Sequence, residues 1–205
     1  GNIGIGYEAL LVHTAGHRNM AIGYGAMNDT DGTNISSGSA ATVLGSLDNI
    51  FIGYDSGGGD WCNGGAAAAS NYNVAIGNYT MDAVMNGALN NTAVGHSSLS
   101  ALTTAINNTA IGHNALLVNL AGGYNTAVGA TALDACTGAQ NTAVGWDAGG
   151  SIIGGDNNVC IGSNSGDVIT TGDGNTCLGD GTDPSAVGGA NQTVIGFNTT
   201  GVADN

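Results

Sequence analysis

The chain has 205 residues, of which 38 are glycine and one is proline, a composition unlike that of an ordinary globular domain. Collagen is excluded because glycine does not fall on every third residue, and generic disorder is disfavoured because the apolar residues recur periodically. One basic residue stands against fifteen acidic ones, and a net charge of −14 disfavours a nucleic-acid partner. We interpret the acidity as solubility of an apolar-cored rod, with a saline habitat or scattered divalent-cation binding as alternatives.

Membrane insertion is not expected. No run of about 18 apolar residues predicts a membrane span, and no basic start followed by an apolar stretch predicts a signal peptide. The chain begins at Gly1 rather than at Met, so we expect it to be a segment of something longer, such as a fibre.

A five-residue phrase recurs along the chain, as in Asn125-Thr126-Ala127-Val128-Gly129. Its copies lie about 17 residues apart, with two longer gaps near the N-terminus. The closing glycines of the copies are Gly6, Gly23, Gly53, Gly77, Gly95, Gly112, Gly129, Gly145, Gly162, Gly179 and Gly196. This period predicts an all-β fold, a parallel β-solenoid (β-roll) of about eleven coils that forms a single repeat domain over residues 1–205.

Each copy begins four residues before the closing glycine with an amide side chain. This asparagine column predicts a corner before a strand, because Asn is favoured in turns, and amides stacked in register also bond one another as a ladder. Its members are Asn2, Asn19, Asn49, Asn73, Asn91, Asn108, Asn125, Asn141, Asn158, Asn175 and Gln192.

The three residues that follow predict a short strand. The first forms a threonine column from Thr92 onward, interrupted by Val159 and preceded by apolar residues. The third forms an aliphatic column, almost wholly β-branched, which favours a strand. Its members are Ile5, Ile22, Ile52, Ile76, Val94, Ile111, Val128, Val144, Ile161, Leu178 and Ile195. We predict that this column forms the core.

The residue between them forms a small column on the opposite face of the strand. Its restricted size predicts a close neighbour on that face, which we expect to be a sister chain. The members are Gly4, Ala21, Phe51, Ala75, Ala93, Ala110, Ala127, Ala143, Cys160, Cys177 and Val194.

The closing glycine predicts the corner after the strand, where a positive φ or a close approach excludes a Cβ atom. A small residue three positions later and a large apolar one four positions later predict a second short strand, whose filling is lost from Gly149 onward. A second glycine seven residues before the closing one, such as Gly122, predicts the opposite turn. The repeat residues on which we expect the fold to depend are Asn91, Gly95, Asn108, Gly112, Asn125, Val128, Gly129, Asn141 and Gly145.

Two insertions, at about 28–48 and 57–72, lengthen early coils. The second places Trp61 in a glycine-rich segment. Loops on a rigid scaffold often carry recognition, whereas a loop that the solenoid merely tolerates is the alternative, and both stay open.

An aromatic column follows the closing glycine directly. Together with Trp61 it supplies the candidate recognition residues for a cell-surface receptor or glycan, although packing between subunits is the favoured interpretation. These residues are Tyr7, Tyr24, Tyr54, Trp146 and Phe197. His96 and His113 share this column and are expected to stack on adjacent coils, as outward polar residues rather than as a metal ladder.

We expect no enzyme, no cofactor and no metal. The four histidines lie in no nucleophile motif, and one basic residue leaves few side chains to stabilise a developing anion. Neither an EF-hand loop nor a calcium β-roll motif is present. The cysteines Cys62, Cys136, Cys160 and Cys177 match no zinc spacing, and the adjacent Cys160 and Cys177 are expected to be free thiols in place of Ala.

A single coil offers about two or three large inward side chains, too few to offset the entropy of ordering it. Packing of the small column against symmetry mates predicts a cyclic homo-oligomer.

The phrase Asn-x-Ala-Ile/Val-Gly-x-x-Ala/Ser/Thr, as in Asn73 to Thr80 or Asn125 to Ala132, resembles the head repeats of YadA-like trimeric autotransporter adhesins. It is even more similar to the "NTAVGxxAL" arrays of phage tail-fibre and other virion-fibre proteins, because the adhesin repeat is usually shorter. The resemblance covers nearly the whole chain apart from the two insertions.

That resemblance implies a left-handed homotrimer and a structural or adhesive fibre of a virion that supports host attachment outside the cell. A bacterial adhesin head at the cell surface is the alternative. The threonine column motivates a third, a solenoid that binds ice or another regular surface.

Overall fold

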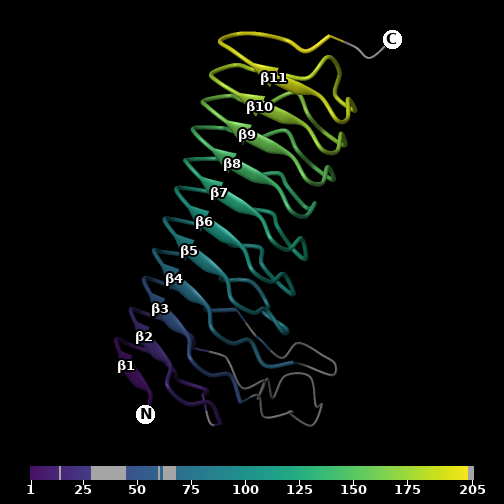
Figure 1. The fold of residues 1–205 in the computed structure, drawn as a ribbon. Coiled ribbons are helices and arrows are strands. Elements are labelled where there is room, and N and C mark those ends of the chain that lie inside the picture. Colours follow the sequence, from purple (N-terminus) through teal and green to yellow (C-terminus); the bar gives the residue numbers. More distant parts are fainter. Residues whose placement is uncertain (14, 29–44, 60, 62–67, 203–205) are drawn as a thin grey trace.

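The computed structural model describes residues 1–13, 15–28, 45–59, 61 and 68–202, which form coils stacked along one axis, with the two ends of the chain at opposite ends of the stack (Figure 1). Most of the first insertion, residues 29–44, and part of the second, residues 60 and 62–67, therefore lie outside the described residues. In the described part each coil contributes one strand of three residues, and no helix is present. The strands are β1 Ile3–Ile5, β2 Met20–Ile22, β3 Ile50–Ile52, β4 Val74–Ile76, β5 Thr92–Val94, β6 Thr109–Ile111, β7 Thr126–Val128, β8 Thr142–Val144, β9 Val159–Ile161, β10 Thr176–Leu178 and β11 Thr193–Ile195.

The strands pair in chain order into one parallel eleven-stranded sheet. Their register superimposes the repeat columns: in the β7–β8 pair, Ala127 lies opposite Ala143 and Val128 opposite Val144. The register survives the first insertion, because Ala21 of β2 lies opposite Phe51 of β3. The predicted parallel β-solenoid of about eleven coils is therefore confirmed.

The predicted second strand of each coil is wrong in the described part of the chain. Beyond the closing glycine the backbone runs through turns, with only isolated bridges such as Leu89 with Ile106. The reason is that the second and fourth residues after the glycine are left-handed, as at Thr131 (φ 57°) and Leu133 (φ 52°). With two left-handed residues, successive side chains no longer point to opposite faces as they do in a strand. Ala132 and Leu133 therefore both point inward and are fully buried.

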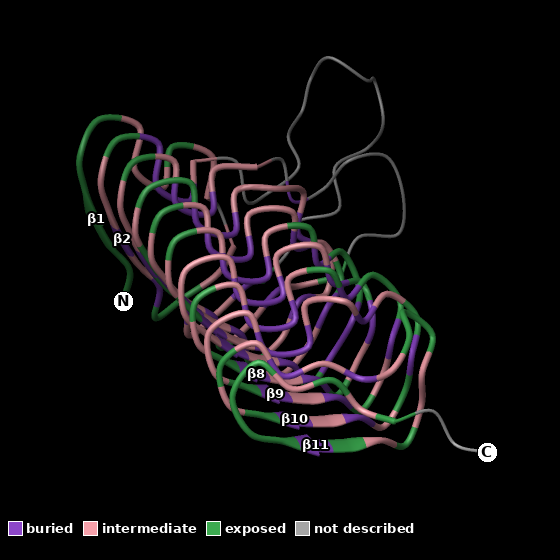
Figure 2. Cartoon of the chain, turned by 90° about the horizontal axis from the view of Figure 1, so that it is seen from above, coloured by how far each residue is buried: buried purple, intermediate pink, exposed green. Residues whose placement is uncertain are grey.

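The core lies inside each coil and contains the small column. Ala127 has no exposed surface, whereas Val128 is partly exposed on the other side of the strand. The prediction that the aliphatic column, including Val128, forms the core is therefore wrong, and the two faces are exchanged. Figure 2 shows the buried segments gathered on the inner side of the coils. The small column is small because the turn opposite, through residues such as Leu133, already fills a narrow interior.

Where a coil departs from the column pattern, a large side chain at one inward position is matched by a glycine at another. Phe51 is the one large aromatic ring in the small column, and the turn of its coil carries Gly57 where the two neighbouring coils carry Met27 and Met81. A Cβ atom at Gly57 would lie 2.6 Å from the Phe51 ring. Toward the C-terminus, Gly149 leaves room that Ile152 occupies, since a Cβ atom there would lie 3.0 Å from the Ile152 Cδ1 atom. The C-terminal coils thus keep an apolar filling, supplied from a different position.

The asparagine column forms the predicted ladder. The backbone N–H of Asn125 donates to Oδ1 of Asn108 at 2.8 Å, and the N–H of Asn141 donates to Oδ1 of Asn125 at 2.9 Å. The Nδ2 group of Asn125 donates to the carbonyl of the second glycine of the following coil, Gly138, at 2.9 Å. The buried amide is thus satisfied on both of its ends, which buried polar groups require.

The closing glycines stack directly on one another. Gly129 has φ +145°, a region that side chains avoid, and a Cβ atom there would lie 2.0 Å from the carbonyl oxygen of Gly145. Both predicted reasons for glycine at this corner, the backbone conformation and the close approach, are confirmed.

Candidate interaction surface

The outward face of the sheet carries the aliphatic column along its whole length. The threonine, aliphatic and aromatic columns point outward because they alternate with the buried small column and the closing glycine. Within the aliphatic column the exposed fraction is 41% at Ile111 and 66% at Ile195. Other exposed members are Ile5, Ile76, Val144, Ile161 and Leu178. Contiguous exposed apolar surface of this kind marks an interaction site.

Six aromatic rings form a continuous ladder beside the aliphatic column. Tyr7 stacks on Tyr24 and Tyr24 on Tyr54, with ring centroids 5.3 and 5.2 Å apart. His96 stacks on His113 at 5.6 Å, as predicted for these two residues of adjacent coils. Between the two groups lies Tyr79, whose ring is 5.3 Å from that of Tyr54 and 5.6 Å from that of His96. We call these six residues the ring ladder.

Sequence reasoning missed Tyr79, because the aromatic column is occupied in that coil by Asn78. Tyr79 is one residue later, in a left-handed conformation (φ 56°), and its ring connects Tyr54 to His96 through T-shaped contacts, with interplanar angles of 66° and 69°. The signal in the sequence was an aromatic residue displaced by one position from an otherwise regular column.

Trp61 does not belong to the surface. It is fully buried, its ring lies 5.6 Å from that of Phe51, and its Nε1–H donates to the carbonyl of Gly57 at 3.1 Å. Recognition by this segment was one of two open alternatives for Trp61, and the side chain instead contributes to the core. The structure therefore removes Trp61 from the candidate recognition residues.

Trp146 and Phe197 are exposed, as expected for surface residues, at 57% and 68%. They lie in the aromatic column but away from the ring ladder. The column neighbours of Trp146 are Ala130 and Ser163, so its coil carries an isolated ring.

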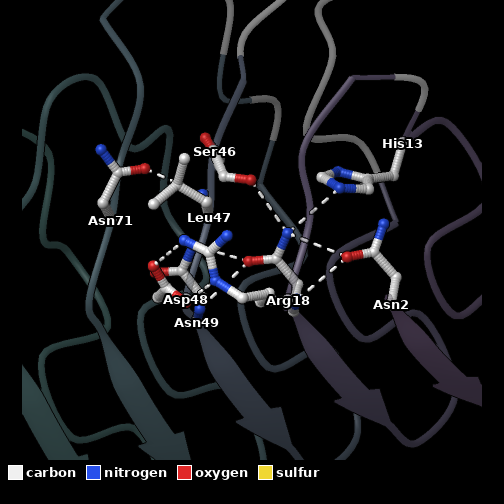
Figure 3. A network of polar contacts seen from close by, with 9 residues as sticks. Asn2, His13, Arg18, Ser46, Leu47, Asp48, Asn49 and Asn71 are labelled. Atoms are coloured by element: carbon white, nitrogen blue, oxygen red, sulfur yellow. Dashed lines mark hydrogen bonds and ion pairs between the residues drawn. The ribbon is translucent and has the colours of Figure 1, made fainter.

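A polar network joins the first coils where the first insertion rejoins the sheet (Figure 3). Nε and Nη2 of Arg18 each donate to one carboxylate oxygen of Asp48, at 2.6 Å. Leu47 N–H donates to Oδ1 of Asn71, and the buried Asn19 amide contacts His13 Nε2 at 3.2 Å. The hydrogen bond from Arg18 lowers the pKa of Asp48. These hydrogen bonds join residues of successive coils at the N-terminal end of the sheet.

One buried amide lacks partners. Asn119 has no exposed surface, and neither its Oδ1 nor its Nδ2 atom has a hydrogen-bond partner. It lies seven residues after its closing glycine, a position filled in neighbouring coils by Leu102 and Cys136. This inward column was not recognised from the sequence, because its residue types differ from coil to coil.

The described cysteines Cys136, Cys160 and Cys177 are free and buried, as expected of the adjacent pair. Cys160 and Cys177 lie opposite one another in β9 and β10. The hydrogen bond with Cys177 and burial raise the pKa of Cys160, and burial raises the pKa of Cys136 to about 11. Thiols that stay protonated are poor nucleophiles, so Cys136 and Cys160 serve as packing, whereas the hydrogen bond with Cys160 lowers the pKa of Cys177.

Two carboxyl groups meet near the C-terminal end of the sheet. Burial, together with the charge of Asp167, raises the pKa of Asp183 to about 6. The described residues contain no group of three or more His, Cys, Asp or Glu side chains that could hold a metal ion.

Comparison of the chain with protein-family models, with curated proteins and with solved structures found no match. In the part of the chain that the structure describes, no helix is long and apolar enough to cross a membrane.

Proposed function

We propose that this chain is a structural segment of a virion attachment fibre, built as a homotrimer of left-handed solenoids that pack side by side through their outward faces. The rod supports attachment to a host surface from outside the cell. The aliphatic column carries this proposal: it is aligned over eleven strands and is at least partly exposed in every one of them.

The size of the face suits a stable assembly. Eleven strands at ~4.8 Å span about 50 Å, and the five residues from the threonine to the aromatic column span about 13 Å. The product, about 650 Å², approaches the ~800 Å² that each partner contributes to a standard interface. Burial of this face adds apolar contact area, of which a single narrow coil buries too little to offset the entropy of ordering it. The packing surface is thus the aliphatic face rather than the small column.

The virion assignment rests on the resemblance of the repeats to fibre arrays, with a bacterial adhesin head as the alternative. The acidic surface, with a net charge of −14, is compatible with either exterior setting and repels polyanions. Flanking sequence separates the two: a C-terminal membrane anchor together with a signal peptide points to the adhesin.

The oligomeric state tests the proposal. Multi-angle light scattering of the soluble chain should give three times its 19.9 kDa mass. Ile22→Asp combined with Ile52→Asp should shift the mass toward that of one chain while a β-type circular dichroism spectrum is retained. A monomeric wild-type chain at micromolar concentration contradicts the assembly.

The outward threonines favour a second candidate, binding to ice or another regular surface. Thr92, Thr109, Thr126 and Thr142 lie opposite one another in consecutive strands and are partly exposed. They form a row of hydroxyl and methyl groups at the ~4.8 Å strand spacing. Thermal hysteresis in dilute solution, abolished by Thr126→Leu, supports this candidate, and no hysteresis removes it. Both candidates use one face, so a trimer that buries it excludes the second.

A further inference from the structure

The ring ladder is a rigid and periodic surface feature. Its backbone is fixed by bonds between coils: Gly25 N–H donates to the Tyr7 carbonyl, Asp55 N–H to the Tyr24 carbonyl and Tyr79 N–H to the Tyr54 carbonyl, at 3.0, 2.9 and 2.9 Å. These bonds hold six exposed rings in one line along the axis of the solenoid. A ligand therefore meets the rings already ordered, which lowers the entropic cost of binding.

The stacking decides which ligands fit. Tyr7, Tyr24 and Tyr54 are nearly parallel, with interplanar angles of 20° and 8°, so each ring turns its faces toward its neighbours along the axis. What points outward is a row of ring edges. A sugar that packs on an open ring face finds no such face within this row. A flat ligand lying along the row contacts several edges at once, an arrangement that aromatic pairs favour.

The charge around the ladder is negative. Glu8 and Asp55 follow Tyr7 and Tyr54 directly in the chain, and a Cβ atom at Gly25 would lie 2.3 Å from a carboxylate oxygen of Asp55. Asp55 therefore lies over the residue that follows Tyr24. The pKa of Tyr24 is raised, first by the charge of Glu8 and then by burial and by its neighbours. The single arginine, Arg18, is engaged with Asp48.

We propose that the ring ladder, from Tyr7 to His113, is a binding site for elongated, flat, cationic aromatic molecules that lie along the solenoid axis. The edges of the parallel rings of Tyr7, Tyr24 and Tyr54 contact the plane of the ligand, together with the adjacent aliphatic column, which is exposed at Ile5 and Ile76. Glu8 and Asp55 attract its charge. A molecule of two or three linked rings covers about three strand spacings of ~4.8 Å, so the ladder is long enough to hold it. The ring ladder lies at the edge of the face through which the proposed trimer packs, so dye binding and complete burial of that face exclude one another.

Thioflavin T, a flat benzothiazolium cation, is a suitable probe. Titration into the full chain should give saturable fluorescence enhancement. Tyr54→Ala should lower the affinity at least tenfold, because it divides the ladder into two short stacks. Trp146→Ala, which removes an exposed ring of the same column outside the ladder, should change it less than twofold. Asp55→Asn should weaken the cationic dye several-fold but leave a neutral benzothiazole analogue unchanged.

Fluorescence that is absent, or that Tyr54→Ala and Trp146→Ala reduce equally, overturns the site. Equal loss of the cationic and the neutral dye in Asp55→Asn overturns the role of charge. Circular dichroism of each variant shows that the fold is retained. Light scattering of the same samples separates the two proposals: a trimer without dye binding refutes the ladder site alone, and a monomer that binds dye refutes the assembly alone.

Discussion

The coils of β1–β4 and those of β5–β11 share three interior columns and differ in their exteriors. Inside, both regions carry the small column, the asparagine ladder and the stacked closing glycines. Outside, the first strand residue is apolar in β1–β4, whereas from Thr92 onward it is Thr in every strand except β9. The tyrosines of the ring ladder also lie in the first four coils. The interior is restricted by the width of one coil, so the two regions differ chiefly on the outward face.

The common interior is tested most severely at the closing glycines. Gly53→Ala and Gly129→Ala should each lower the free energy of unfolding by about 3–5 kcal/mol, because both combine a forbidden φ with a clash against the next coil. Urea denaturation at fixed protein concentration measures the loss. Gly154→Ala, where a Cβ atom meets nothing within 4 Å, is the matched control and should be nearly neutral. A large difference between the two regions contradicts the idea of a uniform interior.

The exteriors should differ in how strongly they associate. Each outward aliphatic residue buried by a partner contributes about 1.5–3 kcal/mol, so a pair of Asp substitutions should weaken association by at least about 100-fold. Ile22→Asp with Ile52→Asp should have a larger effect than Val94→Asp with Val128→Asp, because the surrounding columns of β1–β4 are also apolar.

Sedimentation velocity over a range of concentrations measures both pairs. Ser151→Asp with Thr171→Asp adds the same charge at exposed turn positions and should leave association unchanged. If the two pairs of Asp substitutions weaken association equally, the exteriors of β1–β4 and β5–β11 contribute equally to the free energy of association.

Asn119 is an interior position at which a substitution should stabilise the fold. Asn119→Leu should raise the free energy of unfolding by about 1–3 kcal/mol, because a buried amide without partners is replaced by the residue type found at Leu102. The reverse change, Leu102→Asn, should destabilise by a similar or larger amount. Thermal melting of the two variants gives the comparison, and a loss of stability in Asn119→Leu shows that the amide has a partner after all.

The stability of the N-terminal coils, near Asp48, and that of the C-terminal coils, near Asp183, should change in opposite directions as the pH falls. The pKa of Asp183 is raised from 3.8 to about 6, so its contribution to stability is present below about pH 4 and is lost as the pH rises through 6. Discounted for solvent exposure, the effect is about 1 kcal/mol or less. The pKa of Asp48 is lowered, so the stability from its pairing with Arg18 is present above pH 3.8 and lost below.

Hydrogen exchange at pH 4.5 and 7, corrected for intrinsic rates, should show stronger protection around β10 and β11 at the lower pH. Asp183→Asn should abolish that difference. Equal protection at both values in the wild-type chain contradicts the raised pKa.

Much of the fold followed from the sequence, because stacking repeats the same restriction in every coil. Asn125 and Gly129 were correctly placed at corners, since only a satisfied amide and a residue without Cβ fit there. The inward and outward faces could not be assigned, because alternation separates two faces without saying which one is inside. The deciding fact was the pair of left-handed residues, Thr131 and Leu133, which directs the large turn side chain across the coil.

The candidate surface was only partly predictable for a related reason. Tyr7, Tyr24 and Tyr54 lie in one column, so their alignment could be read from the spacing. Trp61 and Tyr79 break the spacing, and only packing shows that one fills the core beside Phe51 while the other completes the ladder.

The contacts between strands also bear on how such a chain varies in length. Each strand meets only the strand before it and the strand after it, and its asparagine bonds only to neighbouring coils. Duplication or deletion of one whole coil therefore leaves every other contact in place. A change of one coil would therefore alter the length of the rod by one strand spacing, about 4.8 Å, without disturbing the pairing of the other strands.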